Sequence, residues 1–164
     1  MNYGGIIKAS LSDGAGWRVV LFVSGCEHAC PGCHNQESWN PGYGTPFGER
    51  ALNSLTAELA RPEIDGLTVS GGDPLFPQNR ESVERLLKTV KLMFPEKTIW
   101  LYTGYSWEDV ASLPLMKYVD VCVDGRYEAG LRDTTIAFRG SSNQRIIDVK
   151  KSLELSDTVI LECD

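Results

Sequence analysis

The sequence has no long hydrophobic run, no dense cluster of basic residues and no export signal. Its longest apolar stretches, such as Val19 to Val23, are strand-sized and far short of the ~20 residues of a membrane span. Lys and Arg number 16 against 22 Asp and Glu, so the net charge is −6. A protein that binds nucleic acid or an anionic membrane is therefore not expected. The N-terminus lacks a charged segment followed by an apolar one, which favours a cytoplasmic protein.

Several common catalytic signatures are also missing. No G-x-G-x-x-G precedes a helix, and no Lys-Ser or Lys-Thr pair follows a glycine turn, so a phosphate loop is not expected. No G-x-S-x-G elbow presents a serine nucleophile. The chain has only two histidines, His28 and His34, and neither has the spacing of a catalytic dyad.

The length and apolar content fit one globular domain over residues 1–164, with a variable tail from about 148. The chain has 164 residues, 42% of them apolar, which is enough for a real core. Hydrophobic periodicity predicts strands at 17–23, 66–70, 98–103 and 118–123, helices at 48–61, 79–94 and 106–112, and weaker strands at 145–149 and 157–161.

Strands and helices alternate, and the strands are continuously apolar. This pattern predicts an α/β fold with a mainly parallel sheet and outer helices. The chain is too short for a complete eight-unit barrel of ~250 residues, so a partial barrel or an open sheet remains. In either case the chemistry should lie at the carboxyl ends of the strands, where residues 24–40, 70–77 and 124–130 fall.

Three cysteines follow the first predicted strand in C-x3-C-x2-C spacing: Cys26, Cys30 and Cys33. Three thiolates on one short loop can converge on one metal centre, but a 4Fe–4S cluster normally takes four. One iron would then keep an open position, as a catalytic metal site requires. Cys122 and Cys163 stand alone in apolar sequence and are expected to be small buried hydrophobic residues.

Other interpretations of this loop remain open. Cys30 to His34 matches C-x-x-C-H, the attachment motif of c-type haem, which is typical of exported proteins. The same pair could be a redox dithiol, which leaves Cys26 without a role. A zinc site with three cysteines and either His28 or His34 is also chemically sound.

Two turns carry further candidate site residues. Gly71, Gly72 and Asp73 follow a strand, and backbone carbonyls beside a carboxylate suit an ammonium group. Asp124 and Arg126 follow another strand, and an arginine there can bind a carboxylate. Taken alone, each turn could equally be an ordinary solvated connection.

The combination of these motifs is more specific than any one of them. C-x3-C-x2-C, then Gly71 to Pro74, then Asp124 to Arg126, resembles the radical S-adenosylmethionine superfamily. Asp13 to Gly16, with Arg18 and the loop ending at Asn35, resembles its glycyl-radical activating enzymes. The short length, SGGDPL and RGSSNQ at 139–144 resemble the branch that acts on anaerobic ribonucleoside-triphosphate reductase. The resemblance covers residues 1 to about 147.

The resemblance implies a partial (β/α) barrel of the radical SAM type. It implies that Cys26, Cys30 and Cys33 hold a 4Fe–4S cluster and that S-adenosylmethionine binds its fourth iron. Reductive cleavage of this cofactor would give a 5′-deoxyadenosyl radical that takes a hydrogen atom from a glycine. The partners implied are the large catalytic subunit of the reductase and a low-potential electron donor.

The resemblance also assigns the cofactor contacts residue by residue. Gly71, Gly72 and Asp73 would receive the methionine amino group, and Asp124 and Arg126 would form the element that binds its carboxylate. The segment of Gly32, Cys33 and His34 would pass beside the adenine.

On the sequence alone, two other functions remain open. One is the activation of a pyruvate formate-lyase-like protein, and the other is a non-enzymatic zinc or iron–sulfur interaction module. The polar segment at 139–144 is expected to dock the protein partner, although it could simply close the mouth of the barrel.

Overall fold

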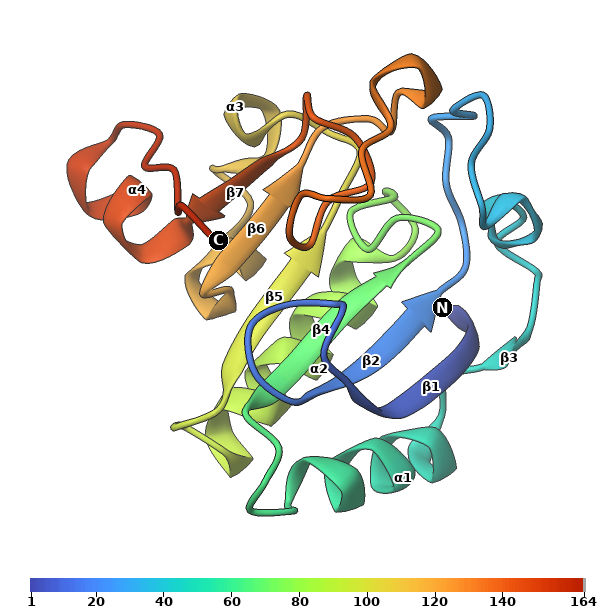
Figure 1. Ribbon diagram of the computed structural model, residues 1–164. Helices are drawn as coiled ribbons and strands as arrows, with labels where there is room; N and C mark the ends of the chain where they lie inside the picture. Colours follow the sequence, from blue (N-terminus) through green and yellow to red (C-terminus); the bar gives the residue numbers. More distant parts are fainter. Residues whose placement is uncertain (164) are drawn as a thin grey trace.

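The computed structural model describes residues 1–163, which fold around one seven-stranded sheet (Figure 1). The strands are β1 (Asn2–Ser10), β2 (Arg18–Val23), β3 (Thr45–Pro46), β4 (Gly66–Gly71), β5 (Thr98–Tyr102), β6 (Val121–Asp124) and β7 (Arg145–Asp148), in the order β3-β1-β2-β4-β5-β6-β7. The four central strands β2, β4, β5 and β6 are parallel, whereas β1, β3 and β7 are antiparallel to their neighbours. The predicted α/β class is confirmed, but the sheet is mixed, with parallel strands only in its centre.

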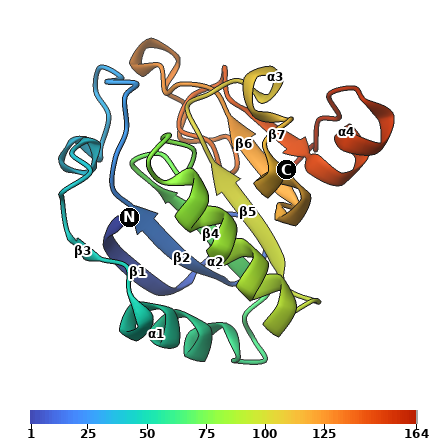
Figure 2. The same ribbon diagram turned by 180° about the vertical axis from the view of Figure 1, so that it is seen from behind.

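Helices cover one face of the sheet, and loops cover the other. The helices are α1 (Glu49–Leu59), α2 (Arg80–Met93), α3 (Trp107–Val110) and α4 (Val149–Leu155), with short 3-10 helices η1 (Gln36–Trp39), η2 (Pro114–Tyr118) and η3 (Ala129–Leu131). Seen from behind, α2 crosses in front of the central strands and α1 lies below them (Figure 2). The opposite face carries the β1–β2 loop and the long connection between β6 and β7 (Figure 1).

The main hydrophobic core lies between the sheet and its helices. In α2, Val83, Leu86, Leu87 and Val90 form the predicted apolar stripe and are all buried. Pro95 follows the C-cap residue of this helix and cannot continue it. The predicted helices therefore form where the periodicity placed them, and their apolar faces join one core.

A buried arginine joins three strands on the loop-covered face. Arg18 is fully buried, and its Nε donates to Thr68 Oγ1 at 3.1 Å. The guanidinium also donates to the Leu67 and Thr98 carbonyls, at 2.6 and 2.9 Å, and to the Ala15 carbonyl at 3.3 Å. Burial lowers its pKa to about 10, so it remains charged at neutral pH. Arg18 thus holds β2, β4, β5 and the β1–β2 loop in register.

The ends of the chain depart most from the sequence-based expectations. Strands β1 and β3 were not predicted, and the tail after residue 148 forms α4. Of the weak candidates, 145–149 becomes β7, but 157–161 contributes only an isolated bridge between Ile147 and Ile160. Cys122 is buried in the core, as predicted, and Cys163 is half-buried against a second apolar cluster.

None of the helices within residues 1–163 is both long enough and apolar enough to cross a bilayer.

A carboxylate at the other end of the sheet joins two helices to a strand. Asp120 pairs with Lys91 of α2 and Lys150 of α4, each at 2.6 Å, and accepts a hydrogen bond from the Ile99 amide at 2.7 Å. Burial alone would raise the pKa of Asp120, but the two lysines and the amide outweigh it and hold the pKa below its ordinary value.

Replacing Asp120 with Asn is expected to reduce the free energy of unfolding by about 1–3 kcal/mol at neutral pH. The folded pKa lies below the unfolded value of ~3.9, so the carboxylate stabilises the fold above that pH and loses its effect as the pH falls further. Urea unfolding at neutral pH and at about pH 3 measures this, and the gap between wild type and variant should shrink at the acidic pH. The exposed Glu154→Gln change on α4 is the control. A gap that does not change with pH would contradict the assignment.

Candidate active site

The loops that follow the parallel strands meet at one edge of the sheet. Because β2, β4, β5 and β6 run in the same direction, their carboxyl ends lie together there. A cavity of about 220 Å³ opens at this edge, and all four following loops line it. A cavity therefore lies at the edge of the sheet where the sequence predicted the chemistry.

The three loop cysteines all line this cavity. Cys26, Cys30 and Cys33 are half-buried and form no disulfide. Left-handed backbone at Ala29 and Gly32, with φ of 49° and 76°, winds the loop so that the cysteines face one space. Burial, followed by nearby negative charges, raises the pKa of the Cys26 thiol to about 11.

This donor set fits an iron–sulfur cluster with one iron that no cysteine holds. Three soft sulfur donors border a single cavity, and a bound metal would displace their protons. Cys122 lies in the core behind the sheet and Cys163 packs against the second apolar cluster, so neither lines the cavity. Within the described chain the cavity offers three thiols and no fourth.

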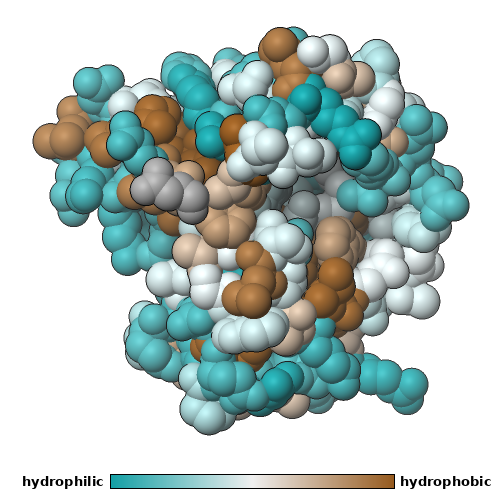
Figure 3. Space-filling view, viewed as in Figure 1, coloured by the Kyte–Doolittle hydropathy of each residue, from teal (hydrophilic) through white to brown (hydrophobic). Residues whose placement is uncertain are grey.

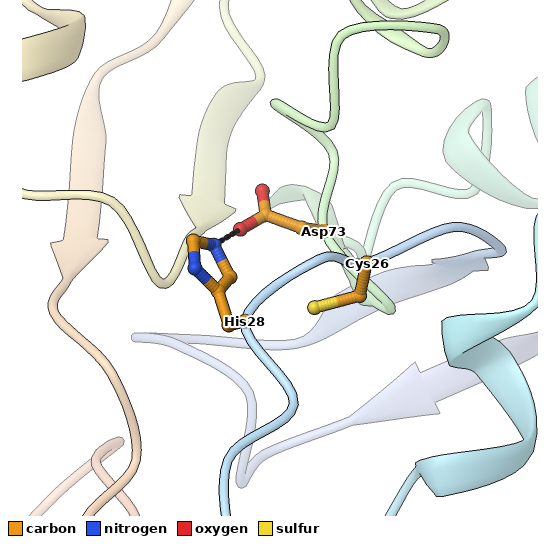
Figure 4. A group of neighbouring side chains, drawn as sticks. All are labelled: Cys26, His28 and Asp73. Atoms are coloured by element: carbon orange, nitrogen blue, oxygen red, sulfur yellow. Dashed lines mark hydrogen bonds and ion pairs between the residues drawn. The ribbon is translucent and has the colours of Figure 1, made fainter.

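A buried hydrogen bond between His28 and Asp73 lies beside Cys26 (Figure 4). His28 Nε2 donates to Asp73 Oδ2 at 2.6 Å, and the two side chains are only 4% and 1% exposed. A carboxylate can only accept, so Nε2 carries the proton of this bond. The ring lies edge-on to Tyr105, with centroids 4.5 Å apart, while Nδ1 is buried without a hydrogen-bond partner.

The Asp73 carboxylate also binds two further segments. It accepts hydrogen bonds from Thr103 Oγ1 at 2.9 and 3.0 Å and from the Gly104 amide at 2.9 Å, both just after β5. The Leu75 amide of its own turn donates at 2.8 Å. Asp73 thus connects the cysteine loop, the turn after β4 and the turn after β5.

The turn after β4 therefore presents its backbone to the cavity, with the carboxylate behind. Ser70, Gly71 and Gly72 line the cavity, whereas Asp73 does not. Gly71 has φ of 106°, and a Cβ there would lie 2.5 Å from the Val23 amide nitrogen. A Cβ at Gly72 would meet the Gly25 carbonyl oxygen at 2.6 Å. Only glycine fits either position.

Asp124 and Arg126, which the sequence predicted to bind the cofactor, do not line the cavity. Asp124 is 1% exposed, and it binds the Trp107 amide at 2.7 Å and Arg145 Nε at 3.0 Å. Arg145 also pairs with Glu108 at 2.9 Å, and that bond lowers the pKa of Glu108 to about 2. Arg126 is exposed, and its carbonyl accepts from Asn143 Nδ2 at 2.8 Å. Gly125, which lies between them in the turn after β6, lines the cavity.

The adenine segment lies partly in the cavity. Cys33 and His34 line it, whereas Gly32 is exposed and lies beside Ala129, which is 3.3 Å from the position of a Cβ. The ring of Tyr127 lies 6.1 Å from that of His34 and also lines the cavity. Sequence reasoning missed Tyr127, although an aromatic residue directly after the Asp124–Arg126 turn was a visible signal.

The segment at 139–144 forms part of the cavity wall. Gly140 and Gln144 line the cavity, and Ser141 is fully buried. The Gln144 amide donates to the Gly125 carbonyl at 3.0 Å and accepts from the Gly140 amide at 2.9 Å. The sequence left open whether residues 139–144 dock the partner or close the mouth of the site. These contacts favour the second alternative.

Comparison with known proteins agrees with these site features. The family model described as "4Fe-4S single cluster domain" matches residues 12–147. A relative from Enterobacteria phage T4 is 49% identical over 146 residues, which cover 89% of this chain and 93% of the relative. Relatives from Escherichia coli K12 and Pasteurella multocida are 37% and 39% identical over 148 and 152 residues, covering 88% and 89% of this chain and 96% of each relative.

All three relatives are named anaerobic ribonucleoside-triphosphate reductase-activating protein. The match covers most of both chains in each case, and the family model includes the cysteine loop and every lining turn up to Ile147. The chain therefore belongs to the family of anaerobic ribonucleoside-triphosphate reductase-activating proteins, and its residues 12–147 match a 4Fe–4S single cluster domain.

Proposed function

We propose that this protein generates the glycyl radical on the large catalytic subunit of an anaerobic ribonucleoside-triphosphate reductase. The observation that carries the proposal is the cavity lined by three thiols and no fourth, in a chain of this family. When bound, a reduced 4Fe–4S cluster and S-adenosylmethionine supply the radical chemistry that removes a hydrogen atom from a glycine Cα. A low-potential electron donor and a cytoplasmic location, where thiols stay reduced, belong to the same proposal.

The fold suits this role as a partial (β/α) barrel of the radical SAM type. Parallel strands β2, β4, β5 and β6 carry helices on one face and direct their following loops toward the cavity at their carboxyl ends. Antiparallel β1 and β7 then flank the parallel centre. This interpretation rests on the strand order and on the location of the cavity.

The cysteine loop would hold the cluster, and its neighbours would tune it. The backbone amide of His28 donates to the Cys26 sulfur, and this bond lowers the pKa of the thiol against the larger effect of burial. Hydrogen bonds to ligating sulfurs are one of the ways a protein sets a cluster's potential. The hydrogen bond to Asp73 fixes the His28 side chain, so that the amide stays in place.

The turns around the cavity would hold S-adenosylmethionine. Ser70, Gly71 and Gly72 line the wall, and their backbone carbonyls would bind the methionine ammonium, with Asp73 supporting the turn from behind. Arg126 is exposed and unrestrained by ion pairs in the described chain, so it can turn toward the methionine carboxylate. Asp124 would act through Arg145 to fix the end of β6, where this turn begins.

The remaining contacts would position the adenine and exclude water. His34 and Tyr127 present two rings to the cavity, with Gly32 and Cys33 beside them. Gly32 carries no side chain that could stack on a base, so the aromatic surface comes from Tyr127.

The function is tested by mixing the protein anaerobically with the reductase subunit, S-adenosylmethionine and a strong reductant. We expect a glycyl radical on the reductase, detected by electron paramagnetic resonance. Cys30→Ala should give none, because two thiols cannot hold a cluster with one open iron. Cys122→Ala should behave as wild type, because Cys122 lies in the core behind the sheet.

Metal content is the control for this experiment. Wild type and Cys122→Ala should bind iron to the same extent, and Cys30→Ala should lose most of it. Zinc in place of iron would establish the interaction module instead, and a radical formed by Cys30→Ala would contradict the ligand assignment.

Arg126→Ala is expected to weaken S-adenosylmethionine binding by about 10- to 100-fold, the effect of one charged hydrogen bond. Binding is measured on iron-loaded protein by equilibrium dialysis, and the iron content should not change. Arg132→Ala, at an exposed arginine beside η3, is the matched control and should bind normally. Equal affinity in the two variants would remove Arg126 from the site.

A further inference from the structure

A second and larger cavity opens beside the first. It has a volume of about 580 Å³ and lies between β1, the end of β2 and the segment that follows the cysteine loop. Both cavities are lined by Cys33, His34, Asn35 and Gly71, so they adjoin along this short segment. Figure 3 shows that this face of the molecule is hollowed, with hydrophobic atoms along part of the rim.

The β1 side of this cavity is bare backbone. Gly4 and Gly5 form part of the wall, and a Cβ at Gly5 would have no atom within 4 Å. The backbone of Gly5 is not left-handed, so neither packing nor conformation within this chain requires glycine there. The absence of a side chain at Gly5 leaves an open space beside β1, at the position that pairs with Phe22 of β2.

The outer edge of β1 is free next to this space. Strand β3 pairs only with Asn2 and Tyr3, so in the part of the chain that the structure describes β1 has no partner on that side from Gly4 onward. An unpaired edge offers a row of amide and carbonyl groups to an added strand. Ile7 lies on the same face as Gly5 and is 43% exposed, which extends the space with an apolar surface.

The charges around the cavity restrict what it can bind. Among residues 1–163, no lysine or arginine lines it, and Glu37 supplies a negative charge at the rim, where its carboxylate accepts a hydrogen bond from Tyr43. The lining residues therefore offer no positively charged side chain that could bind a nucleotide or another phosphate compound. A neutral or basic extended peptide fits both this charge and the free strand edge.

We infer that this β1 groove, lined by Gly4, Gly5, Phe22 and Tyr43, binds the glycine-bearing segment of the partner as an extended chain along the edge of β1. The inference rests on the proposed function, which requires a glycine Cα to come within contact distance of the bound cofactor. The groove adjoins the cofactor cavity, whereas the cavity between α3 and α4 and the one between α1 and α2 share no wall residue with it.

The test fills the groove without touching the cofactor cavity. Gly5→Phe should leave iron content and reductant-driven cleavage of S-adenosylmethionine unchanged, but lower the yield of glycyl radical on the reductase at least about ten-fold. Gly5→Ala, which adds one methyl group to open space, should stay near wild type. Ile7→Lys alters only an exposed side chain on the same face, replaces its apolar surface with a positive charge, and should show the same selective loss if Gly5→Phe does not fold.

The matched control places the same ring at another glycine with open surroundings. Gly48→Phe, at the start of α1, should keep both activities. Normal radical yield in Gly5→Phe and Ile7→Lys would overturn the inference. Loss of cofactor cleavage together with radical yield at normal iron content would also overturn it, because the groove would then hold the cofactor. Absence of cleavage by wild type would instead refute the proposed function, and this inference with it.

Discussion

The buried carboxylate of Asp73 accepts hydrogen bonds from three separate segments, and the cavity at the edge of the sheet depends on their meeting there. His28 reaches it from the cysteine loop, Leu75 from its own turn, and Thr103 and Gly104 from the turn after β5. Because the Asp73 side chain is only 1% exposed, these donors replace the hydrogen bonds that water would otherwise make to the carboxylate. Removing the carboxylate would leave buried donors unsatisfied in three loops at once.

The cysteine loop therefore has one side that is held by contacts, the fixed side, and one side that faces the two cavities, the open side. The fixed side, at His28, is bound to Asp73 and packed against Tyr105. The open side, at Cys33 to Asn35, borders both the cofactor cavity and the β1 groove. The same loop thus separates the proposed place of radical generation from the proposed place of the glycine, while remaining short enough to keep them in contact.

The sequence predicted the features that depend on local pattern. The four parallel strands and helix α2 follow from continuous or periodic apolar residues, and the cysteine spacing identified the loop. Strand β1 was missed because Gly4 and Gly5 interrupt its pattern and its partner is antiparallel. The contacts of Asp73 and Asp124 could not be predicted either. Thr103 is 30 residues from Asp73, and Arg145 is 21 residues from Asp124, so only the folded chain brings these partners together.

Hydrogen exchange of the Asp73→Asn variant, measured by mass spectrometry, tests most directly whether Asp73 joins these loops. The new amide group would face the Gly104 amide or the His28 ring, both of which are donors. We expect residues 24–40 and 103–106 to lose protection together with the turn at 71–76, while α1 and α2 keep theirs. Asp157→Asn, at an exposed aspartate after α4, should change none of these segments. Loss of protection confined to residues 71–76 would contradict the account.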